Sequence, residues 1–254
     1  MDSTYTGSAI RVRRSSDNAE QDIGFNVFSE LDTVSLLDFA GTGDAFVKVW
    51  YDQASTNDAT QTTTANQPQI VSSGAVIVEN GKPAVKFDGS NDFLEDVSKS
   101  ASLTGHTLIT VVKTNTTAVE QRFLSNPNGS ANILNLSSGN YTFQDYELSP
   151  TLLSKATISA DTTQSLLVGS INSTNKIAKI WKNGTQGTNG ATLTKTLQLL
   201  NTAETDMKVG ANRITSANFV DGYIQEMIYY PTDQDNAGNR TDIEDNINTF
   251  YNIY

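Results

Sequence analysis

The segment Asp221-Gly-Tyr-Ile-Gln-Glu-Met-Ile-Tyr-Tyr-Pro231 and the residues behind it carry the most structural information in this chain. Residues 223–229 have a β-branched and aromatic load that is typical of a strand. After Pro231 the apolar residues recur at steps of three and four, which describes one face of a helix: Ile243, Ile247, Phe250, Tyr251 and Tyr254. The tail therefore predicts a last sheet strand followed by a short closing helix.

Short strand-like segments fill most of the rest of the chain. We expect strands at residues 9–13, 46–51, 75–78, 84–88, 107–113, 122–125, 132–136, 141–144, 165–171, 176–182 and 206–209, and a short helix at residues 31–39. Asn-Gly and Asp-Gly pairs favour turns because both residues tolerate positive φ, and they occur at residues 80–81, 88–89, 128–129, 183–184 and 221–222. This pattern predicts an all-β sandwich or barrel. With no repeat or linker, residues 1–254 are expected to form one domain.

The composition excludes several classes of function. The chain has 254 residues and no cysteine, so disulfides and Cys-based metal sites are absent. Seventeen Lys and Arg stand against 28 Asp and Glu, a formal net charge of -11 that repels phosphate backbones, so we expect no nucleic-acid partner. No run of eighteen apolar residues occurs, so we expect no membrane insertion.

The first residues, Met1-Asp-Ser-Thr-Tyr-Thr-Gly-Ser8, are polar and lack a basic and then apolar leader. Two expectations fit this start. The sequence is either cut from a longer secreted protein or belongs to a protein made in the cytoplasm and exported by another route, as virion proteins are.

Both ends of the chain resemble a known enzyme family. Ala9-Ile-Arg-Val-Arg-Arg-Ser-Ser-Asp17, Val49-Trp-Tyr-Asp-Gln53 and Asn57-Asp-Ala-Thr-Gln61 resemble the N-terminal part of the catalytic domain of α-L-arabinofuranosidase B enzymes. The tail from Gly222 to Asp233, with the helix behind it, resembles the closing strand and helix of the same group. Residues 81–92 and 180–184 are similar to the wider laminin G-like and lectin-like superfamily. The resemblance implies an all-β, concanavalin A-like jelly-roll sandwich of two antiparallel sheets with a short C-terminal helix.

The catalytic residues of that family are not carried over. The enzymes place a nucleophilic Glu and an acid/base Asp in the middle of the domain, with a vicinal cysteine pair, and this chain has no cysteine and no position that matches either carboxylate. Sandwich glucanases supply acids as Glu-x-Asp-x-x-Glu on one strand face. Glu20-Gln-Asp22 and Glu204-Thr-Asp206 lack the third acid, and Glu226 stands alone. We therefore expect structural or solvated roles for these acids and name no catalytic residue.

Trp50, Tyr51, Asp52 and Gln53 are the predicted carbohydrate-binding residues. An aromatic ring at a strand end can stack on a pyranose face while Asp52 accepts hydroxyl protons. The alternative is a core Trp50 with Asp52 holding the following loop through side-chain-to-backbone bonds.

Asp88, Asn91 and Asp92 are the predicted metal ligands. Asp88-Gly-Ser-Asn-Asp92 places several oxygen donors in five residues, which suits Ca²⁺, with Asp221 or Asp233 as distant ligands. An ordinary Asx-turn explains the same residues, and no other cofactor is expected.

Two further sets of polar residues are weighed against structural roles. His106 is the single histidine, so no Cys–His pair is available, and we expect it in a turn that enters the following strand. Arg11 and Arg13 share a strand face. They could hold a sulfated or uronic sugar, but pairing with the protein's own carboxylates is expected.

These observations predict a non-catalytic carbohydrate-recognition or structural module, extracellular or on a virion surface. The expected setting is a virion appendage (fibre, tail or capsid decoration) or a bacterial surface adhesin. Its partners would be a cell-surface glycan or polysaccharide and other virion or surface proteins, with homo-oligomers supplying avidity. The alternatives are a glycoside hydrolase of the α-L-arabinofuranosidase type and a structural component without a ligand.

Overall fold

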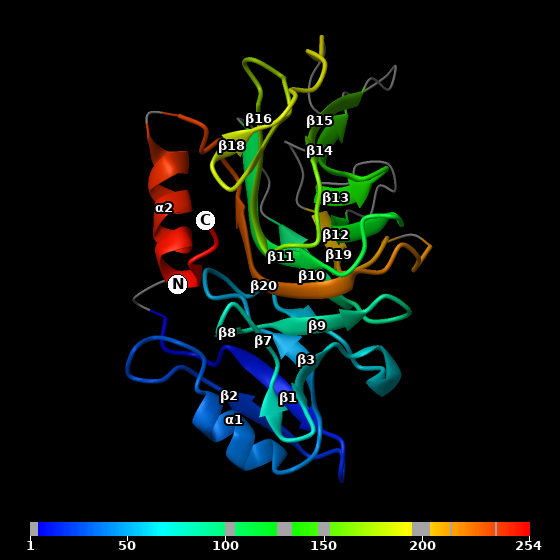
Figure 1. The fold of residues 1–254 in the computed structure, drawn as a ribbon, viewed down its shortest axis with the longest axis vertical. Coiled ribbons are helices and arrows are strands. Elements are labelled where there is room, and N and C mark those ends of the chain that lie inside the picture. Colours follow the sequence, from blue (N-terminus) through cyan, green and yellow to red (C-terminus); the bar gives the residue numbers. More distant parts are fainter. Residues whose placement is uncertain are drawn as a thin grey trace.

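Two layers of antiparallel strands build the protein (Figure 1). The computed structural model describes residues 5–99, 105–125, 134–146, 153–194, 204–213, 215–236 and 238–254. The first layer has the order β2 (Glu20–Ile23), β1 (Ile10–Arg14), β3 (Ala45–Trp50), β5 (Gln69–Ser72), β9 (Val85–Asp88), β20 (Asp221–Tyr230), β11 (Gly105–Thr114), β16 (Ser165–Asn172), β17 (Lys179–Lys182) and β18 (Thr185–Gln186). The predicted all-β sandwich is confirmed.

The second layer packs against the upper part of the first. Its order is β10 (Leu94–Lys99), β19 (Glu204–Val209), β12 (Gln121–Ser125), β13 (Leu134–Ser137), β14 (Asn140–Tyr146) and β15 (Leu153–Ser159). The two-residue strand β4 (Ala59–Thr60) pairs with both β3 and β10 and so joins the layers. Short pairings complete the sheet edges: β6 (Ala75–Val76) with β5, and β7 (Val78–Glu79) with β8 (Lys82–Pro83).

The main core lies between the two layers. Alternation along β14 sends Tyr141 and Phe143 inward, where both are fully buried, and Phe123 of β12 packs beside them. Gly169 of β16 lies directly opposite, since a Cβ there would stand 2.2 Å from the Phe143 ring. The aromatic rings of one layer thus fill the space that a small residue leaves in the other.

Two helices cover opposite regions of the first layer. Helix α1 (Thr33–Ala40) begins at Asp32, whose carboxylate accepts the Ser35 N–H, and buries Leu36 and Ala40. Helix α2 (Asn239–Tyr251) lies against the outer face of β11, β16 and β20 and contributes to a second core cluster: Ile109, Val111, Leu166, Val168, Trp181, Ile247 and Tyr251. In the described part of the chain neither helix has the length and apolar content to cross a bilayer.

Both predicted helices are confirmed, with one correction to the helical face. Ile247 and Tyr251 are buried, but Phe250 is 40% and Tyr254 51% exposed, and Tyr254 lies beyond the helix end. The structure adds strands that their polar or short sequences did not signal, above all β2, β5, β10 and β15. Of the predicted strand at residues 132–136, residues 132 and 133 fall outside the described residues, as does the predicted turn at 128–129.

The predicted turns divide into two kinds. Asn80-Gly81 and Asn183-Gly184 adopt positive φ at both residues and close two-residue hairpins. Asp221-Gly222 is not a turn, and both residues lie in β20. A Cβ at Gly222 would stand 2.1 Å from the Lys113 carbonyl oxygen, so glycine is needed there for close approach to β11.

Candidate functional site

A row of polar and aromatic side chains crosses five neighbouring strands of the first layer. Phe46 of β3 is paired with Gln69 of β5, Gln69 with Lys86 of β9, Lys86 with Tyr223 of β20, and Tyr223 with Lys113 of β11. Residues that pair directly across strands stand on the same side of a sheet. All five are partly exposed, so the row lies on the face away from the main core.

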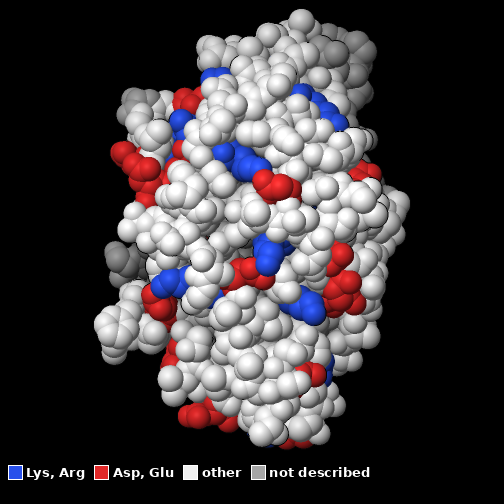
Figure 2. Space-filling view, in the orientation of Figure 1, with Lys and Arg blue, Asp and Glu red and all other residues white. Residues whose placement is uncertain are grey.

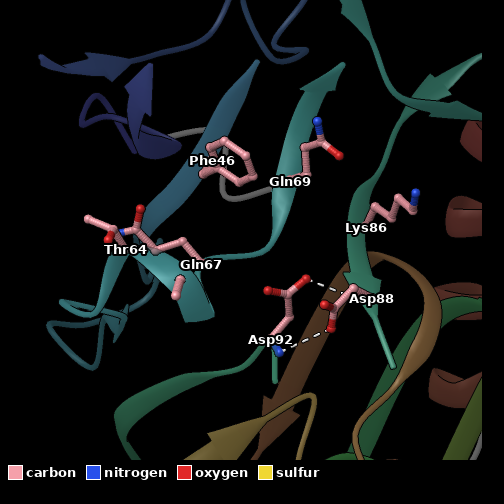
Figure 3. Close-up of a pocket in the computed structure, with 8 residues that line it drawn as sticks. Phe46, Thr64, Gln67, Gln69, Lys86, Asp88 and Asp92 are labelled. Atoms are coloured by element: carbon pink, nitrogen blue, oxygen red, sulfur yellow. Dashed lines mark hydrogen bonds between the residues drawn. The ribbon is translucent and has the colours of Figure 1, made fainter. Parts of the chain in front are cut away.

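A pocket of about 330 Å³ lies at one end of this row (Figure 3). We call it the Phe46 pocket. It is lined by Phe46, Thr64, Ala65, Gln67, Gln69, Lys86, Asp88 and Asp92. The strands β3, β5 and β9 supply one wall, and the 3₁₀ turn η1 (Thr64–Asn66) with the turn after β9 supplies the other. One aromatic ring, two amides, an ammonium and two carboxylates therefore converge on one cavity.

The two carboxylates are held in place by backbone groups. Asp88 Oδ1 accepts the N–H of Ser90 at 2.8 Å and of Asn91 at 3.1 Å, which is an Asx-turn, and Asp92 Oδ2 accepts the Asp88 N–H at 3.0 Å (Figure 3). Asp92 is only 7% exposed. Burial, and then the charge of Asp88, raise the pKa of Asp92 to about 7. Asp92 therefore exchanges a proton near neutrality, where it can donate as well as accept a hydrogen bond.

A buried arginine, Arg13, contacts three of the residues that line the pocket: Phe46, Thr64 and Gln67. The Arg13 guanidinium donates to Gln67 Oε1 at 2.7 Å, to Asn18 Oδ1 at 2.9 Å and to the Thr64 carbonyl oxygen at 3.4 Å. Its carbon Cζ lies 4.9 Å from the centre of the Phe46 ring. The prediction that Arg13 pairs with a carboxylate is wrong, because its partners among the described residues are all neutral oxygens. Desolvation lowers the pKa of Arg13 below its ordinary value.

Charge around the pocket is mixed. Lys86 forms no ion pair with a described residue, whereas Lys48 pairs with Glu20 at 2.6 Å and Lys113 with Glu79 at 2.8 Å. Over the face seen in Figure 2, blue and red side chains are interspersed, without a large area of one sign. The lining of the Phe46 pocket holds one ammonium group, on Lys86, and two carboxyl groups, on Asp88 and Asp92, so it is polar and has more acidic than basic groups.

The predicted calcium ligands divide between the pocket and its rim. Asp88 and Asp92 line the pocket, while the Asn91 side-chain amide donates to the Ala65 carbonyl oxygen at 2.8 Å. Within the described ranges no group of three or more acidic, His or Cys side chains is placed to hold a metal ion. The Asx-turn accounts for the hydrogen bonds of the segment, and the calcium site stays a prediction.

The predicted sugar contacts at residues 50–53 lie outside the Phe46 pocket. Trp50 packs against the main core, and Tyr51 donates its hydroxyl to Asp22 at 2.8 Å. Asp52 accepts the Ala54 N–H and the Ser55 hydroxyl, so it holds the loop that follows β3. These contacts are the ones that the structural alternative describes. Sugar contacts by Trp50, Tyr51, Asp52 and Gln53 stay a prediction.

Three of the acids weighed for catalysis, Glu20, Asp22 and Glu226, lie outside the Phe46 pocket. Glu20 pairs with Lys48, and Asp22 binds Arg11 at 2.7 Å through both carboxylate oxygens. Burial beneath α2 raises the pKa of Glu226, which lies beside Tyr251. Glu204 and Asp206 belong to β19, and their side chains are outside the described part. Glu20 and Asp22 thus make ion pairs of the kind expected for a structural role, and the absence of a catalytic role stays a prediction.

His106 is not in a turn, as the sequence predicted, but is the second residue of β11. It is 1% exposed and lies between the rings of Phe143 and Tyr229, with Nε2 3.7 Å from an oxygen of the buried Asp145. The main reason for the error is that a polar residue at a strand start is usually solvated, whereas here the second layer covers it.

Sequence reasoning missed Phe46, Gln67, Gln69 and Lys86 as site residues. Phe46 and Lys86 fall in strands that were predicted, and their alternation with buried neighbours already places them on the outer face. Gln69 belongs to an unpredicted strand. No local signal indicates that these three strands are neighbours, so the pocket could not be found from the sequence.

Comparisons with known proteins identify the fold. No family model and no curated protein sequence matches this chain. Among solved structures, a GH54 α-L-arabinofuranosidase mutant soaked with 4-nitrophenyl α-L-arabinofuranoside superposes with a TM-score of 0.61 at 13% identity, over 96% of this chain and 60% of that one. An arabinofuranosidase complexed with arabinofuranosyl-α-1,2-xylobiose gives a TM-score of 0.60 at 13% identity, over 96% and 59%.

This likeness confirms part of the sequence-based resemblance. It extends over the middle of the chain, where the sequence resembled the arabinofuranosidases only at the two ends. At 13–14% identity it shows the fold alone. The chain spans about 60% of the length of these enzymes. The laminin G-like resemblance stays a prediction.

Proposed function

We propose that this protein is a non-catalytic carbohydrate-recognition module and that the Phe46 pocket holds a sugar ring. The observation that carries the proposal is the convergence of an aromatic ring, amides and carboxylates on one cavity. A sugar presents hydroxyl groups at its edge and C–H groups on its faces. Asp88 Oδ2 and Asp92 can accept hydroxyl protons, Lys86 can donate to hydroxyl oxygens, and Phe46 covers an apolar ring face.

Pre-organisation favours this use of the pocket. Phe46 is fixed by Arg13, and Asp88 and Asp92 are fixed by the N–H groups of their own turn. A site whose side chains are already held loses less conformational entropy when a ligand binds. One site should bind weakly, and several copies would be needed for tight attachment.

The setting that we propose is a surface that meets a cell-surface glycan or polysaccharide. A virion appendage (fibre, tail or capsid decoration) or a bacterial surface adhesin presents many copies and so gains avidity. Such a module would be extracellular or on the virion surface and would contact other virion or surface proteins. The arabinofuranosidases of the same fold are named for sugar ligands, which supports a sugar as the ligand class here.

A glycan array probed with a multimerised form of the protein tests this proposal. We expect wild-type protein to bind one class of glycan and Phe46→Ala to lose that signal. Phe28→Ala is the matched control, because Phe28 is 80% exposed and does not line the pocket. Urea unfolding checks that both variants fold. Absence of binding by the multimerised wild type would reject carbohydrate recognition and favour a structural component without a ligand.

A second candidate is a glycoside hydrolase of the α-L-arabinofuranosidase type. Two observations favour it: the fold likeness over 96% of the chain, and a protonatable Asp92 beside Asp88 in a pocket. A carboxyl group with a raised pKa beside an ionised one is the arrangement that glycosidases use. Release of 4-nitrophenol from 4-nitrophenyl α-L-arabinofuranoside, abolished by Asp92→Asn, would establish this activity. Glycan binding without release would exclude it for that substrate.

A further inference from the structure

We propose that the ligand is a neutral linear oligosaccharide that lies across the strands, from the Phe46 pocket to Tyr223. This inference rests on the proposed carbohydrate-recognition function and specifies its ligand class. It extends the binding site beyond the pocket to the remainder of the cross-strand row. The ligand would be bound along its length, rather than through one terminal sugar.

The row places two aromatic rings at a separation that suits several sugar residues. Phe46 and Tyr223 are three strand positions apart, with Gln69 and Lys86 between them. Neighbouring strands are about 4.8 Å apart, so the two residues are separated by about 14 Å. Gln69 and Lys86 have polar ends that can hydrogen-bond to hydroxyl groups above them. Along the row, an aromatic ring (Phe46) is followed by two polar side chains (Gln69 and Lys86) and then by a second aromatic ring (Tyr223).

A cation from the next strand outward supports each ring. Arg13 of β1 approaches Phe46 from the side away from β5, and Lys113 of β11 lies 5.5 Å from the centre of the Tyr223 ring, on the side away from β9. Lys113 is itself held by Glu79 at 2.8 Å. The sides of the two rings that face each other across Gln69 and Lys86 are therefore the sides left for a ligand.

A second, acidic row runs beside the first and determines which ligand charge the site favours. Asp88 is paired with Asp221, and the Asn115 side-chain amide donates to Asp221 Oδ1 at 2.7 Å. Asp92 adds a third carboxyl group at the pocket end. Facing these three acids, Lys86 is the one cation of the first row without an ion pair in the described part of the chain. A uronate or sialic acid would be repelled by Asp88 and Asp221, whereas neutral hydroxyl groups can donate to these two carboxylates.

The test measures affinity against ligand length. The neutral glycan with the strongest array signal is prepared as oligosaccharides of increasing length, starting from the single sugar, and titrated by calorimetry into wild-type protein, Tyr223→Ala and Tyr254→Ala. Tyr254 is 51% exposed and lies beyond the end of α2, away from the row, so it is the matched control. We expect the wild-type Kd to fall about tenfold between the single sugar and the longer oligosaccharides, which is about 1.4 kcal/mol.

Tyr223→Ala should keep the affinity for the single sugar and lose the gain with length, while Tyr254→Ala should behave as wild type. A wild-type affinity that does not change with length would overturn the extended site and leave sugar binding in the pocket intact. Array signals confined to acidic glycans would overturn the neutral class. A glycan array without any signal would instead reject the proposed function itself.

Discussion

Replacing Asp92 with Asn should change how the stability of the protein depends on pH. Asp92 is 7% exposed, and its pKa rises from 3.8 to about 7 because burial disfavours the charged form. Between these two pH values the unfolded chain has released the proton and the folded protein still holds it. The free energy of unfolding therefore falls as the pH rises through this window, and the penalty is fully present above about pH 7.

The magnitude follows from the size of the shift. The difference between about 7 and 3.8 is about 3 pKa units, and each unit corresponds to about 1.36 kcal/mol, so ionised Asp92 costs at most about 4 kcal/mol. An Asn side chain is neutral at every pH and can still accept the Asp88 N–H that Asp92 Oδ2 accepts at 3.0 Å. The variant should thus resemble wild type near pH 4 and be more stable by up to about 4 kcal/mol at pH 8.

Urea unfolding followed by the fluorescence of the two Trp residues, at intervals from pH 4 to pH 9, measures this difference. The quantity to compare is the variant minus wild type at each pH, because other buried acids titrate in the same range. Asp38→Asn, on the exposed side of α1, is the control, because it removes a carboxylate from an exposed position outside the pocket. An Asp92→Asn difference that is the same at pH 5 and pH 8 would refute the assigned burial of Asp92.

Three further outcomes can be measured on the same protein. Gly169→Ala should lower the free energy of unfolding by about 1–3 kcal/mol, because the new Cβ would stand 2.2 Å from the Phe143 ring. Gly24→Ala is the control and should change the free energy of unfolding little, because no atom lies within 4 Å of its Cβ. Equal effects of the two substitutions would argue against this packing. Glu244→Gln should remove part of the loss of stability between pH 4 and pH 8, because burial raises the pKa of Glu244 to about 7, and an unchanged pH profile would contradict that burial. Millimolar Ca²⁺ should leave the Tm unchanged, because Asp88 Oδ1 already accepts three backbone N–H groups, from Ser90, Asn91 and Asp92. A rise in Tm that Asp88→Asn abolishes would instead establish the calcium site.

Local residue patterns were sufficient to predict most individual elements. Short runs rich in β-branched, aromatic and other apolar residues marked β3, β9, β11, β16 and β20, and three- and four-residue spacing marked α2. Asn-Gly pairs marked the two-residue hairpins at residues 80–81 and 183–184. These features depend on neighbours a few positions apart in the chain. The strands β10 and β15 lacked such a pattern and were missed, because their pairing with other strands, rather than their own residues, stabilises them.

The sequence by itself determined the fold class, the two-residue hairpins at residues 80–81 and 183–184, and the residue types available to a site: carboxylates, amides and aromatic rings, without cysteine. Only the tertiary structure decided which of them meet. Phe46, Gln69 and Lys86 share a face because of the register between three strands, and a shift by one residue would turn each side chain to the other face. Asp92 likewise lines one pocket with Phe46, Thr64 and Gln67, which are distant from it in the chain, and the burial that raises its pKa is a property of the folded protein.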